Sequence, residues 1–460
     1  MGRSSRHLAL LLVLALAFLF SWGPTPGYAA VPAETSWDVS TENWEDPGNW
    51  TLGVPTASLD AVIDNGGTAQ ISDDAYAQNL TAGRSASETA TGSGYVSHLD
   101  AMLTVGTLTL GQEAVGESPG TWQYSSGRYD MNNTGGGTPS LTAYDLIVSD
   151  LGRGTFIQEG GTVTVTNNLI LGNQIMPGAP QDETYWTYPI SGQYSLWPGA
   201  TAPTLEVQNQ LIIGNFGHGG FEQYSGSVNV YGTDAEPGVG VLVIGKEAGS
   251  YGYYWLDIGF LTVGQEGSPP VTMYVGQGGR GYFSLDYYND PEVEPSLQVY
   301  GNLVVGDQAG SWGKVEQMGG TAMVAGSLIL GNLPGSSGEY HHYNGFLNVV
   351  SVDATPSTMY VGKGGQGYFY QYSALFVDGN MVVGDDGHGE VFSYYYSYTT
   401  VTGDLILGNQ AGTGSYALLS LADQLQPNFL EVWGSLVVGR AGTGEFSQDG
   451  GEVSVGGSLI

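Results

Sequence analysis

The most chemically suggestive stretch of the sequence is Asp385-Asp386-Gly387-His388-Gly389. Two neighbouring carboxyl groups can serve as the general acid and the general base of a glycoside hydrolase, because one can protonate the leaving oxygen while the other activates water. A histidine beside them can tune the pKa of one carboxyl group. Asp385, Asp386 and His388 are therefore the candidate catalytic residues of a polysaccharide-active enzyme.

The place of His388 within the surrounding repeat favours a structural role instead. When the copies are aligned, position 388 coincides within one residue with Ser311, Thr413 and Thr443, and Gly217-His218-Gly219 fills the same corner of another copy. A corner that accepts several small or polar residues does not need a histidine. Because a motif without its structural context is weak, we expect no catalysis at this position.

Two other groups of residues could bind a metal ion. His341 and His342 lie beside Glu339, but neighbouring residues of a strand point to opposite faces, so the two imidazoles are not expected to share an ion. Asp290, Glu292 and Glu294 cluster in an acidic loop and could hold calcium, or could simply face water. We expect no cofactor, with calcium as the one ion that these loops could bind.

Glycine-rich and tyrosine-rich segments suggest two further kinds of site. The segment 364–367 lacks the Lys-Ser/Thr pair and the following helix of a phosphate-binding loop. Tyrosines gather on consecutive copies of the repeat, at Tyr368, Tyr370, Tyr372, Tyr394, Tyr395, Tyr396 and Tyr398. Side chains at the same place in stacked coils lie over one another, which predicts tyrosine ladders. Outward tyrosines could instead face sugars.

These residues belong to a repeat that begins near Asp60. Its simplest copy, 436–458, has three short runs rich in Val, Phe and Leu separated by glycine corners, where the chain can turn. A unit of about 22 residues with three strands matches one coil of a solenoid, which cannot bury its apolar side chains without neighbours. The strands of successive copies begin at Leu146, Leu169, Leu211, Leu242, Met273, Leu303, Leu328, Met359, Met381, Leu405, Leu436 and Leu459.

The sequence therefore predicts an all-β protein, a right-handed parallel β-helix (β-solenoid) with about 14 coils of 22–31 residues. The longer copies carry insertions in which an acidic residue is followed by proline, and proline disfavours strand pairing. We expect these insertions to occupy one place in the unit and to project from one edge. They contain Asp234, Glu266, Glu292, Asp353 and Asp423.

The N-terminal residues differ from the repeat. Residues 1–29 read as a secretory signal peptide, with Arg3 and Arg6 before a short apolar run. Residues 30–59 hold Trp37, Trp44 and Trp50 without strand alternation. They are expected to cap the first coil, with a sugar-stacking platform as the alternative. The repeat domain then covers 60–460, and it stops in mid-coil, which suggests that further coils or a cap follow in a longer protein.

Composition restricts the possible partners. The chain has 44 acidic and 10 basic residues and no cysteine. Its negative charge disfavours nucleic acid and anionic lipid, and the absence of cysteine excludes disulfides and thiolate chemistry. Outside the signal peptide no run is long and apolar enough to span a membrane.

Two resemblances can be given. The pattern Leu-x-Val-Gly-x-x-Gly-x-Gly, an aromatic residue, then Gly-Gly-x-Val-x-Val, best seen in 436–458, 381–404 and 146–168, resembles the repeat of bacterial autotransporter passengers and PEP-CTERM-associated proteins. This resemblance implies export and display on a bacterial surface, although residues 1–460 contain neither a translocation barrel nor a sorting helix. The Asp-Asp and Gly-His-Gly elements resemble those of β-helical polygalacturonases, which carry them on different coils.

We therefore expect a secreted or surface-displayed structural or adhesive β-helical scaffold that is not an enzyme. Extracellular polysaccharide or components of a cell surface are its expected partners. Two alternatives remain open: a β-helical polysaccharide lyase or glycoside hydrolase, and a carbohydrate-binding module. A lyase acting on uronate polymers needs basic residues to neutralise its substrate, and removal of the signal peptide would leave only eight.

Overall fold

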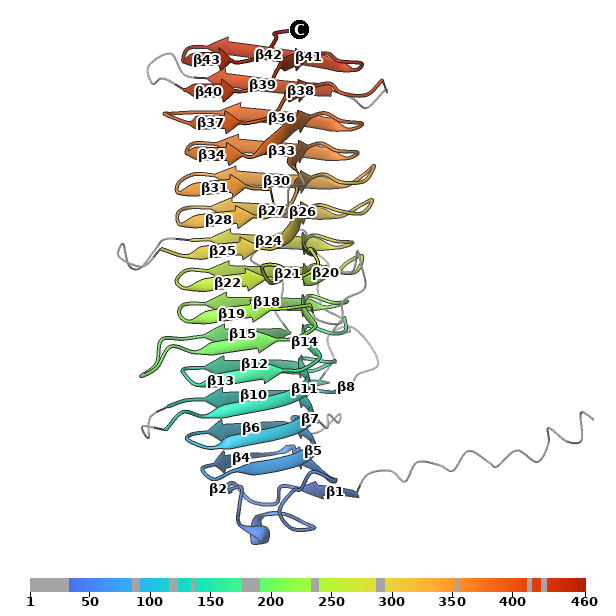
Figure 1. Ribbon diagram of the computed structural model, residues 1–460. Coiled ribbons are helices and arrows are strands. Elements are labelled where there is room, and N and C mark those ends of the chain that lie inside the picture. The colour runs from blue at the N-terminus through green and yellow to red at the C-terminus, as the bar shows by residue number, and fades with distance from the viewer. Residues whose placement is uncertain are drawn as a thin grey trace, which may run out of the picture. The chain divides into compact units, whose positions relative to one another are not determined.

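The computed structural model describes residues 33–84, 92–115, 123–133, 137–175, 191–232, 240–286, 294–351, 356–411, 416–422 and 428–460. Residues 34–460 form one compact unit, in which parallel strands stack coil upon coil (Figure 1). The described residues contain β-strands and one short 3-10 helix, η1 (Pro47–Asn49). The prediction of an all-β parallel β-helix is confirmed. No helix among the described residues is long and apolar enough to cross a membrane.

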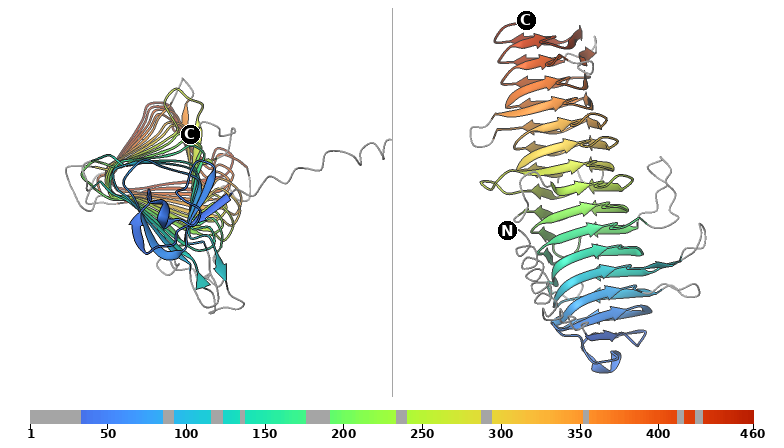
Figure 2. Two further views of the ribbon diagram at one scale, coloured as in Figure 1. Left: turned by 90° about the horizontal axis from the view of Figure 1, so that it is seen from below. Right: turned by 90° about the vertical axis from the view of Figure 1, so that its right-hand side faces the viewer.

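Each complete coil has three sides (Figure 2, left). The first side is a 15-stranded parallel sheet, here called sheet 1, and the other two sides form parallel rows within a second sheet, here called row 2 and row 3. Fourteen strands of sheet 1 follow residue 60, in agreement with the predicted number of coils. The strands of sheet 1 are β2 (Thr41–Asn43), β4 (Asn65–Ile71), β6 (Ser93–His98), β10 (Ser126–Met131), β12 (Arg153–Gln158), β15 (Gly192–Leu196), β18 (His218–Gln223), β21 (Tyr251–Leu256), β24 (Arg280–Leu285), β27 (Trp312–Gln317), β30 (Ser337–His342), β33 (Gln366–Gln371), β36 (His388–Ser393), β39 (Tyr416–Ala422) and β42 (Thr443–Asp449).

Rows 2 and 3 follow sheet 1 in each coil. Row 2 holds β13 (Thr162–Val165), β16 (Thr204–Val207), β19 (Ser227–Val230), β22 (Phe260–Val263), β25 (Ser296–Val299), β28 (Thr321–Val324), β31 (Phe346–Val349), β34 (Ala374–Val377), β37 (Tyr398–Val401), β40 (Phe429–Val432) and β43 (Glu452–Val455). Row 3 holds β14 (Asn168–Leu171), β17 (Gln210–Ile213), β20 (Gly240–Ile244), β23 (Val271–Val275), β26 (Gly301–Val305), β29 (Leu328–Leu330), β32 (Ser357–Val361), β35 (Gly379–Val383), β38 (Leu405–Leu407) and β41 (Leu436–Val438). Both rows extend into the longer strands β5 (Ala75–Ala82), β7 (Met102–Leu110) and β11 (Ser140–Val148), preceded by β3 (Leu59–Ile63) and β1 (Ala33–Ser36). A separate antiparallel pair joins β8 (Ala114–Val115) to β9 (Gln123–Tyr124).

The register of row 3 confirms the repeat alignment. Leu146 pairs with Leu169, Leu169 with Leu211, and each later strand start pairs with the next as far as the bridge between Leu436 and Leu459. From Leu146 to Leu436 these side chains are buried, because one face of every strand lines the core. A shift by one residue would move all of them to the opposite face, so the core fixes the register.

The corner after row 3 requires a left-handed backbone. Gly172 has φ +66°, and a Cβ there would lie 2.4 Å from the carbonyl oxygen of His218. One coil has Ser149 at this position instead, with φ +71°. Its buried hydroxyl donates a hydrogen bond of 2.6 Å to the Gly152 carbonyl. That bond offsets part of the cost of the left-handed conformation.

Stacked aromatic rings form a column inside sheet 1. Tyr129, Phe156, Tyr194, Phe221, Tyr254 and Phe283 are fully buried, and their successive ring centroids lie 4.5–5.5 Å apart. They occupy the same inward place on consecutive strands, here called the ring position. The column follows from the register, because pairing in a parallel stack places equivalent side chains one strand spacing apart.

A second inward place, here called the clamp position, lies two residues after the ring position. Gln158 occupies it in β12, and its side-chain amide donates hydrogen bonds of 3.0 Å to the carbonyls of Gly161 and Thr204. The side-chain oxygen of Gln158, Oε1, accepts a 2.8 Å hydrogen bond from the hydroxyl of Tyr194 in the following coil. Gln223 and Gln317 repeat the arrangement. The side-chain amide of each glutamine thus donates hydrogen bonds to backbone carbonyls at a corner, and its side-chain oxygen accepts one from the tyrosine hydroxyl of the next coil.

The ring and clamp positions are chemically matched from coil to coil. Tyr129, Tyr194, Tyr254 and Tyr340 follow the polar clamps His98, Gln158, Gln223 and Gln317, whereas Phe156, Phe221, Phe283 and Phe446 follow Met131, Leu196, Leu256 and Leu421. In these eight pairs a hydroxyl is present where the clamp residue is polar, and absent where it is apolar. Two other coils differ, because Val391 follows Gln371 and Leu419 follows Ser393. There the side-chain oxygen of Gln371 accepts hydrogen bonds from the hydroxyls of Ser393 and Thr399.

The two histidines at clamp positions differ in their partners. His98 is hydrogen-bonded to the Tyr129 hydroxyl (2.7 Å) and to the Ala101 carbonyl (2.8 Å). His342 is followed by Phe369, which has no hydroxyl, and neither ring nitrogen makes a well-aligned hydrogen bond within the described part of the chain. Burial lowers the pKa of each histidine to about 4, and the nearby Ala101 or Gly345 carbonyl only partly opposes that shift.

The N-terminal tryptophans pack at the start of the core. Trp37, Trp44 and Trp50 are buried, and the ring of Trp50 meets those of Trp37 and Trp44 edge to face at 4.9 and 4.7 Å. The Trp50 indole donates a 2.8 Å hydrogen bond to the Trp44 carbonyl. These three rings are therefore part of the core, and the capping role of residues 30–59 stays a prediction.

The prediction of a single insertion place is wrong. The insertions with Asp234, Glu266 and Asp353 join row 2 to row 3, but those with Glu292 and Asp423 join sheet 1 to row 2. Extra residues at a corner can leave the strands on either side of it in register, so the strand pairing stays intact. The insertions therefore emerge at more than one edge of the coils.

Candidate functional site

The structure places Asp385 at the corner after row 3, directly after Gly384. Its carboxylate accepts hydrogen bonds from the side-chain amides of Asn409 (2.6 Å) and Gln410 (3.1 Å) on the following coil. Asp150 makes the same contacts in a distant coil, with Asn173 (2.8 Å) and Gln174 (2.9 Å). Asp385 thus takes part in a corner ladder that the repeat uses elsewhere.

Asp386 and His388 contact other residues than Asp385 does. Asp386 is exposed, and its backbone N–H donates to the Lys363 carbonyl. His388 opens β36, lies 2.9 Å from a carboxylate oxygen of Glu390, and stacks on Tyr416 with ring centroids 5.0 Å apart. The three predicted residues are close in sequence, but the described hydrogen bonds engage Asp385 and His388 with different neighbours.

The strand register supports the sequence alignment of His388. It pairs with Gln366 in the preceding coil and with Tyr416 in the next, which in turn pairs with Thr443. His218 occupies the same place in β18, whereas Thr413 lies outside the described residues. The position accepts rings, amides and hydroxyls, so it does not specify a catalytic histidine.

The imidazoles of His341 and His342 lie on opposite faces of their strand, as expected from the alternation of side chains. His341 faces outward, 3.4 Å from Glu339 and 3.1 Å from the Tyr343 hydroxyl, whereas His342 is buried in the core. Of the calcium candidates, Asp290 and Glu292 lie outside the described residues, and Glu294 is exposed. Among the residues that are described, no three His, Asp or Glu side chains gather as a metal site would need.

Two carboxyl groups on the outer face of sheet 1, those of Glu316 and Glu339, have lowered pKa values. The hydrogen bond from His341 lowers the pKa of Glu339, assisted by the Trp312 indole. Burial opposes ionisation of Glu316, but hydrogen bonds from Lys314 and Tyr282 outweigh it and lower its pKa. A general acid at neutral pH needs a raised pKa, which these two groups lack.

Asp307 is the described carboxyl group whose pKa is raised. Burial causes the shift, and the Asn332 amide, 2.7 Å away, opposes it. Asp307 lies directly after Gly306 at the same corner as Asp150 and Asp385. Its carboxylate is thus another rung of the corner ladder.

The predicted tyrosine ladders are present on the outer face of sheet 1. Tyr372 stacks between Tyr343 (5.4 Å) and Tyr394 (5.0 Å). Tyr370 lies between His341 (4.5 Å) and Phe392 (5.4 Å) in the adjacent row. Both faces of Tyr370 and of Tyr372 are therefore covered by neighbouring rings, and a sugar could stack only on rings at the end of a ladder.

Sequence reasoning missed one feature of this region. Tyr395 and Tyr396 have φ values of +39° and +54°, and their side chains are 57% and 66% exposed. Other coils place glycine at this corner, for example Gly160-Gly161 and Gly450-Gly451. The signal was available in the sequence, because two tyrosines occupy a turn where several other copies use glycine.

Comparison with known proteins adds nothing to this description: no protein-family model, no curated protein and no solved structure matches the chain. The resemblance of the repeat to autotransporter passengers and PEP-CTERM-associated proteins therefore stays a prediction.

Proposed function

We propose that this chain is a non-catalytic, exported β-helical scaffold that is displayed outside a bacterial cell and adheres through residues on its outer surface. One observation carries the proposal. Asp385, the strongest candidate for acid-base chemistry, makes the same pair of hydrogen bonds as Asp150 in another coil. A residue whose partners are dictated by the repeat has a structural reason to be there.

The charge of the chain also supports a scaffold over a lyase. An enzyme that degrades uronate polymers must bring many negative charges to its surface. The sequence has 44 acidic and 10 basic residues, and such a surface repels polyanions. Export is supported by the basic start and short apolar run of residues 1–29.

Turnover assays test the non-catalytic character. The chain from residue 30 onward would be incubated with acidic and neutral polysaccharides, with and without calcium, while new reducing ends and unsaturated uronates are measured. We expect no turnover. The informative pair of variants is Asp385→Asn and Asp150→Asn, which alter the same corner contact in different coils.

Turnover by the unaltered chain that is lost in Asp385→Asn and kept in Asp150→Asn would contradict the scaffold and favour the polysaccharide-active alternative. Equal loss of melting temperature in both variants, without turnover in any sample, is the result expected for two rungs of one ladder.

A further inference from the structure

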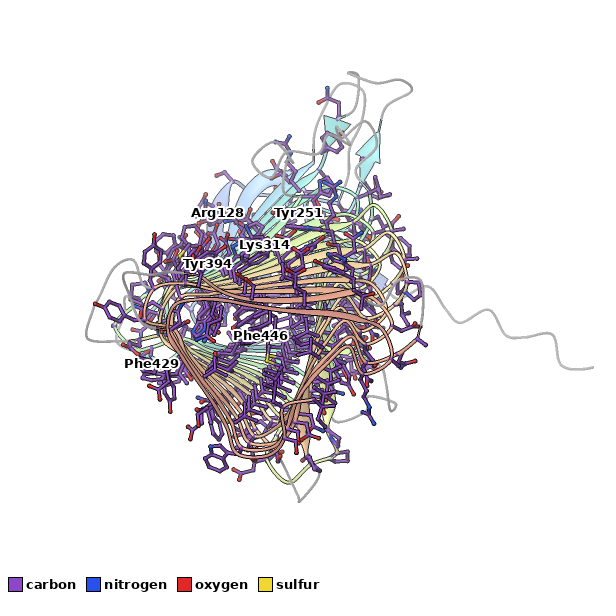
Figure 3. All side chains as sticks on the ribbon, turned by 90° about the horizontal axis from the view of Figure 1, so that it is seen from above. Arg128, Tyr251, Lys314, Tyr394, Phe429 and Phe446 are labelled. Atoms are coloured by element: carbon purple, nitrogen blue, oxygen red, sulfur yellow. The ribbon has the colours of Figure 1, made fainter. Side chains whose placement is uncertain are left out.

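A group of aromatic side chains, four of them exposed, lies where sheet 1 turns into row 2. This group, here called the aromatic corner, consists of Tyr372, Tyr394, Tyr395, Tyr396, Tyr398 and Phe429. Figure 3, which looks along the stack, shows Tyr394 and Phe429 on the outside of the coils near this corner. Ring contacts occur in two parts of the group, since Tyr372 stacks on Tyr394 (5.0 Å) and Tyr395 (6.1 Å), and Tyr398 meets Phe429 at 6.3 Å.

Folding alone does not explain Tyr395 and Tyr396. Both adopt a left-handed backbone, which is unfavourable for residues with a Cβ and for which several other coils use glycine. Their side chains are more than half exposed, so side-chain burial offsets little of the unfavourable backbone free energy. Strained residues that the fold does not need commonly mark a functional surface.

The corner presents open ring faces. The place that follows Tyr394 in the next coil holds Ala422, so the ladder of rings ends there within the described residues. Tyr396 and Tyr398 are 66% and 45% exposed. The interior rungs of the ladder are covered on both faces, whereas these rings are accessible to a flat ligand.

The polar groups at the corner restrict the ligand. The Tyr398 hydroxyl donates a 3.1 Å hydrogen bond to a carboxylate oxygen of Glu431, and five of the six rings in the corner carry hydroxyls. An acidic chain repels a polyanion. A ligand with flat C–H faces and many neutral hydroxyl groups fits the rings and their hydrogen-bonding groups together.

We propose that the aromatic corner binds a neutral polysaccharide, with sugar rings stacked on Tyr394, Tyr396 and Tyr398. The inference rests on the adhesive role proposed above and assigns it to one place. It does not depend on the absence of catalysis, because a binding surface and a hydrolytic site give different readouts.

The first test replaces the strained pair by the residues that other coils use, in the variant Tyr395→Gly/Tyr396→Gly. Removal of the strain should keep or raise the melting temperature. Affinity electrophoresis of the chain from residue 30 onward, in gels with soluble mixed-linkage glucan or galactomannan, should show retardation of the unaltered chain. We expect the double variant to bind the polymers at least about tenfold more weakly than the unaltered chain.

The second test uses two residues from the same place in different coils. Tyr398 and Phe260 both begin a row 2 strand and are exposed by 45% and 54%, and Ser227 and Ser296 occupy the same place elsewhere. Tyr398→Ser should reduce retardation by the neutral polymers. Phe260→Ser, which removes an equally exposed ring away from the corner, should leave it unchanged.

Several outcomes would overturn the inference. One is that neither neutral polymer retards the unaltered chain. Another is that the Tyr395→Gly/Tyr396→Gly variant is retarded as strongly as the unaltered chain. A third is that polygalacturonate retards the unaltered chain more strongly than the neutral polymers do. Sedimentation velocity covers another occupant of the corner. If the unaltered chain self-associates, the double variant does not, and no neutral polymer retards either, the corner is a contact between copies of the chain.

Discussion

Tyrosines stack along this molecule both inside and outside the coils, and the two sets obey different rules. Inside sheet 1 every hydroxyl of Tyr194 and its equivalents has a partner on the preceding coil, so the residue type is dictated by the neighbour. At the aromatic corner Tyr395 and Tyr396 are exposed and occupy a backbone that suits glycine. The inner tyrosines are explained by stability, and the outer ones are not.

Truncation of one ring from each set gives the largest expected difference. Tyr194→Ala removes a fully buried ring that stacks on Phe156 and Phe221, and large-to-small changes of this kind cost about 3–5 kcal/mol. Tyr396→Ala should change the free energy of unfolding by less than about 0.5 kcal/mol. Urea unfolding followed by circular dichroism measures both. Similar losses in the two variants would remove the distinction between the sets.

Acid tests the polar part of the inner column. His98 and His342 have pKa values near 4 in the folded chain and an ordinary value near 6.5 when unfolded. The unfolded chain therefore takes up protons that the folded chain refuses, and stability falls as the pH drops below about 6.5. Between pH 8 and pH 5 each histidine should cost about 2 kcal/mol.

The variant His342→Gln isolates one of these two contributions, because glutamine is the usual residue at the clamp position. Urea midpoints measured from pH 8 to pH 5 should show a clearly smaller pH dependence in this variant. An unchanged dependence would mean that His342 is not held neutral by the core.

Removal of a single hydroxyl sharpens the matching rule. Tyr194→Phe leaves the carbonyl oxygen of Gln158 without its 2.8 Å donor, and an unsatisfied buried acceptor costs about 1–3 kcal/mol. The further change Gln158→Leu recreates the Leu196–Phe221 combination of the next coils. It should recover part of the loss, as a coupling energy in a double-mutant cycle. Additive losses would show that the two residues act independently.

The smallest expected effect is a gain. Phe369→Tyr would place a hydroxyl beside His342, as Tyr129 does beside His98, and one such hydrogen bond adds about 0.5–1.5 kcal/mol. Phe283→Tyr is the matched control, because it follows the apolar Leu256 and should destabilise the chain. Urea midpoints distinguish the pair, and destabilisation by both changes would limit the rule to the coils that already obey it.

Periodicity made most of the architecture predictable. The leucines and methionines from Leu146 to Leu459 mark row 3 because each must point into the same core, and a register error would expose them all. The insertion places were harder, since Glu266 and Glu292 look alike in sequence but follow different strands. Periodicity fixes the distance between copies and does not say which of three corners an added residue joins.

The candidate site was less accessible to sequence reasoning. Asp385 attracts attention through its neighbours in sequence, but its partners Asn409 and Gln410 lie a coil away, and the equivalent Asp150 lies much earlier in the chain. The inner and outer tyrosines could not be separated by composition. They can be distinguished only when the exact position of each tyrosine in its strand is known, because successive side chains point to opposite faces of the sheet.

The matching of ring and clamp positions has a consequence for how such a chain can grow or shrink. From β12 to β21 coils with Phe and Gln alternate with coils that carry Tyr and Leu. Loss of one coil would place a phenylalanine over a glutamine or a second tyrosine over a leucine, whereas loss of two would restore the alternation. In this segment the unit of duplication that preserves every buried hydrogen bond is a pair of coils. Gene rearrangements that respect this unit should survive more readily than those that move one coil.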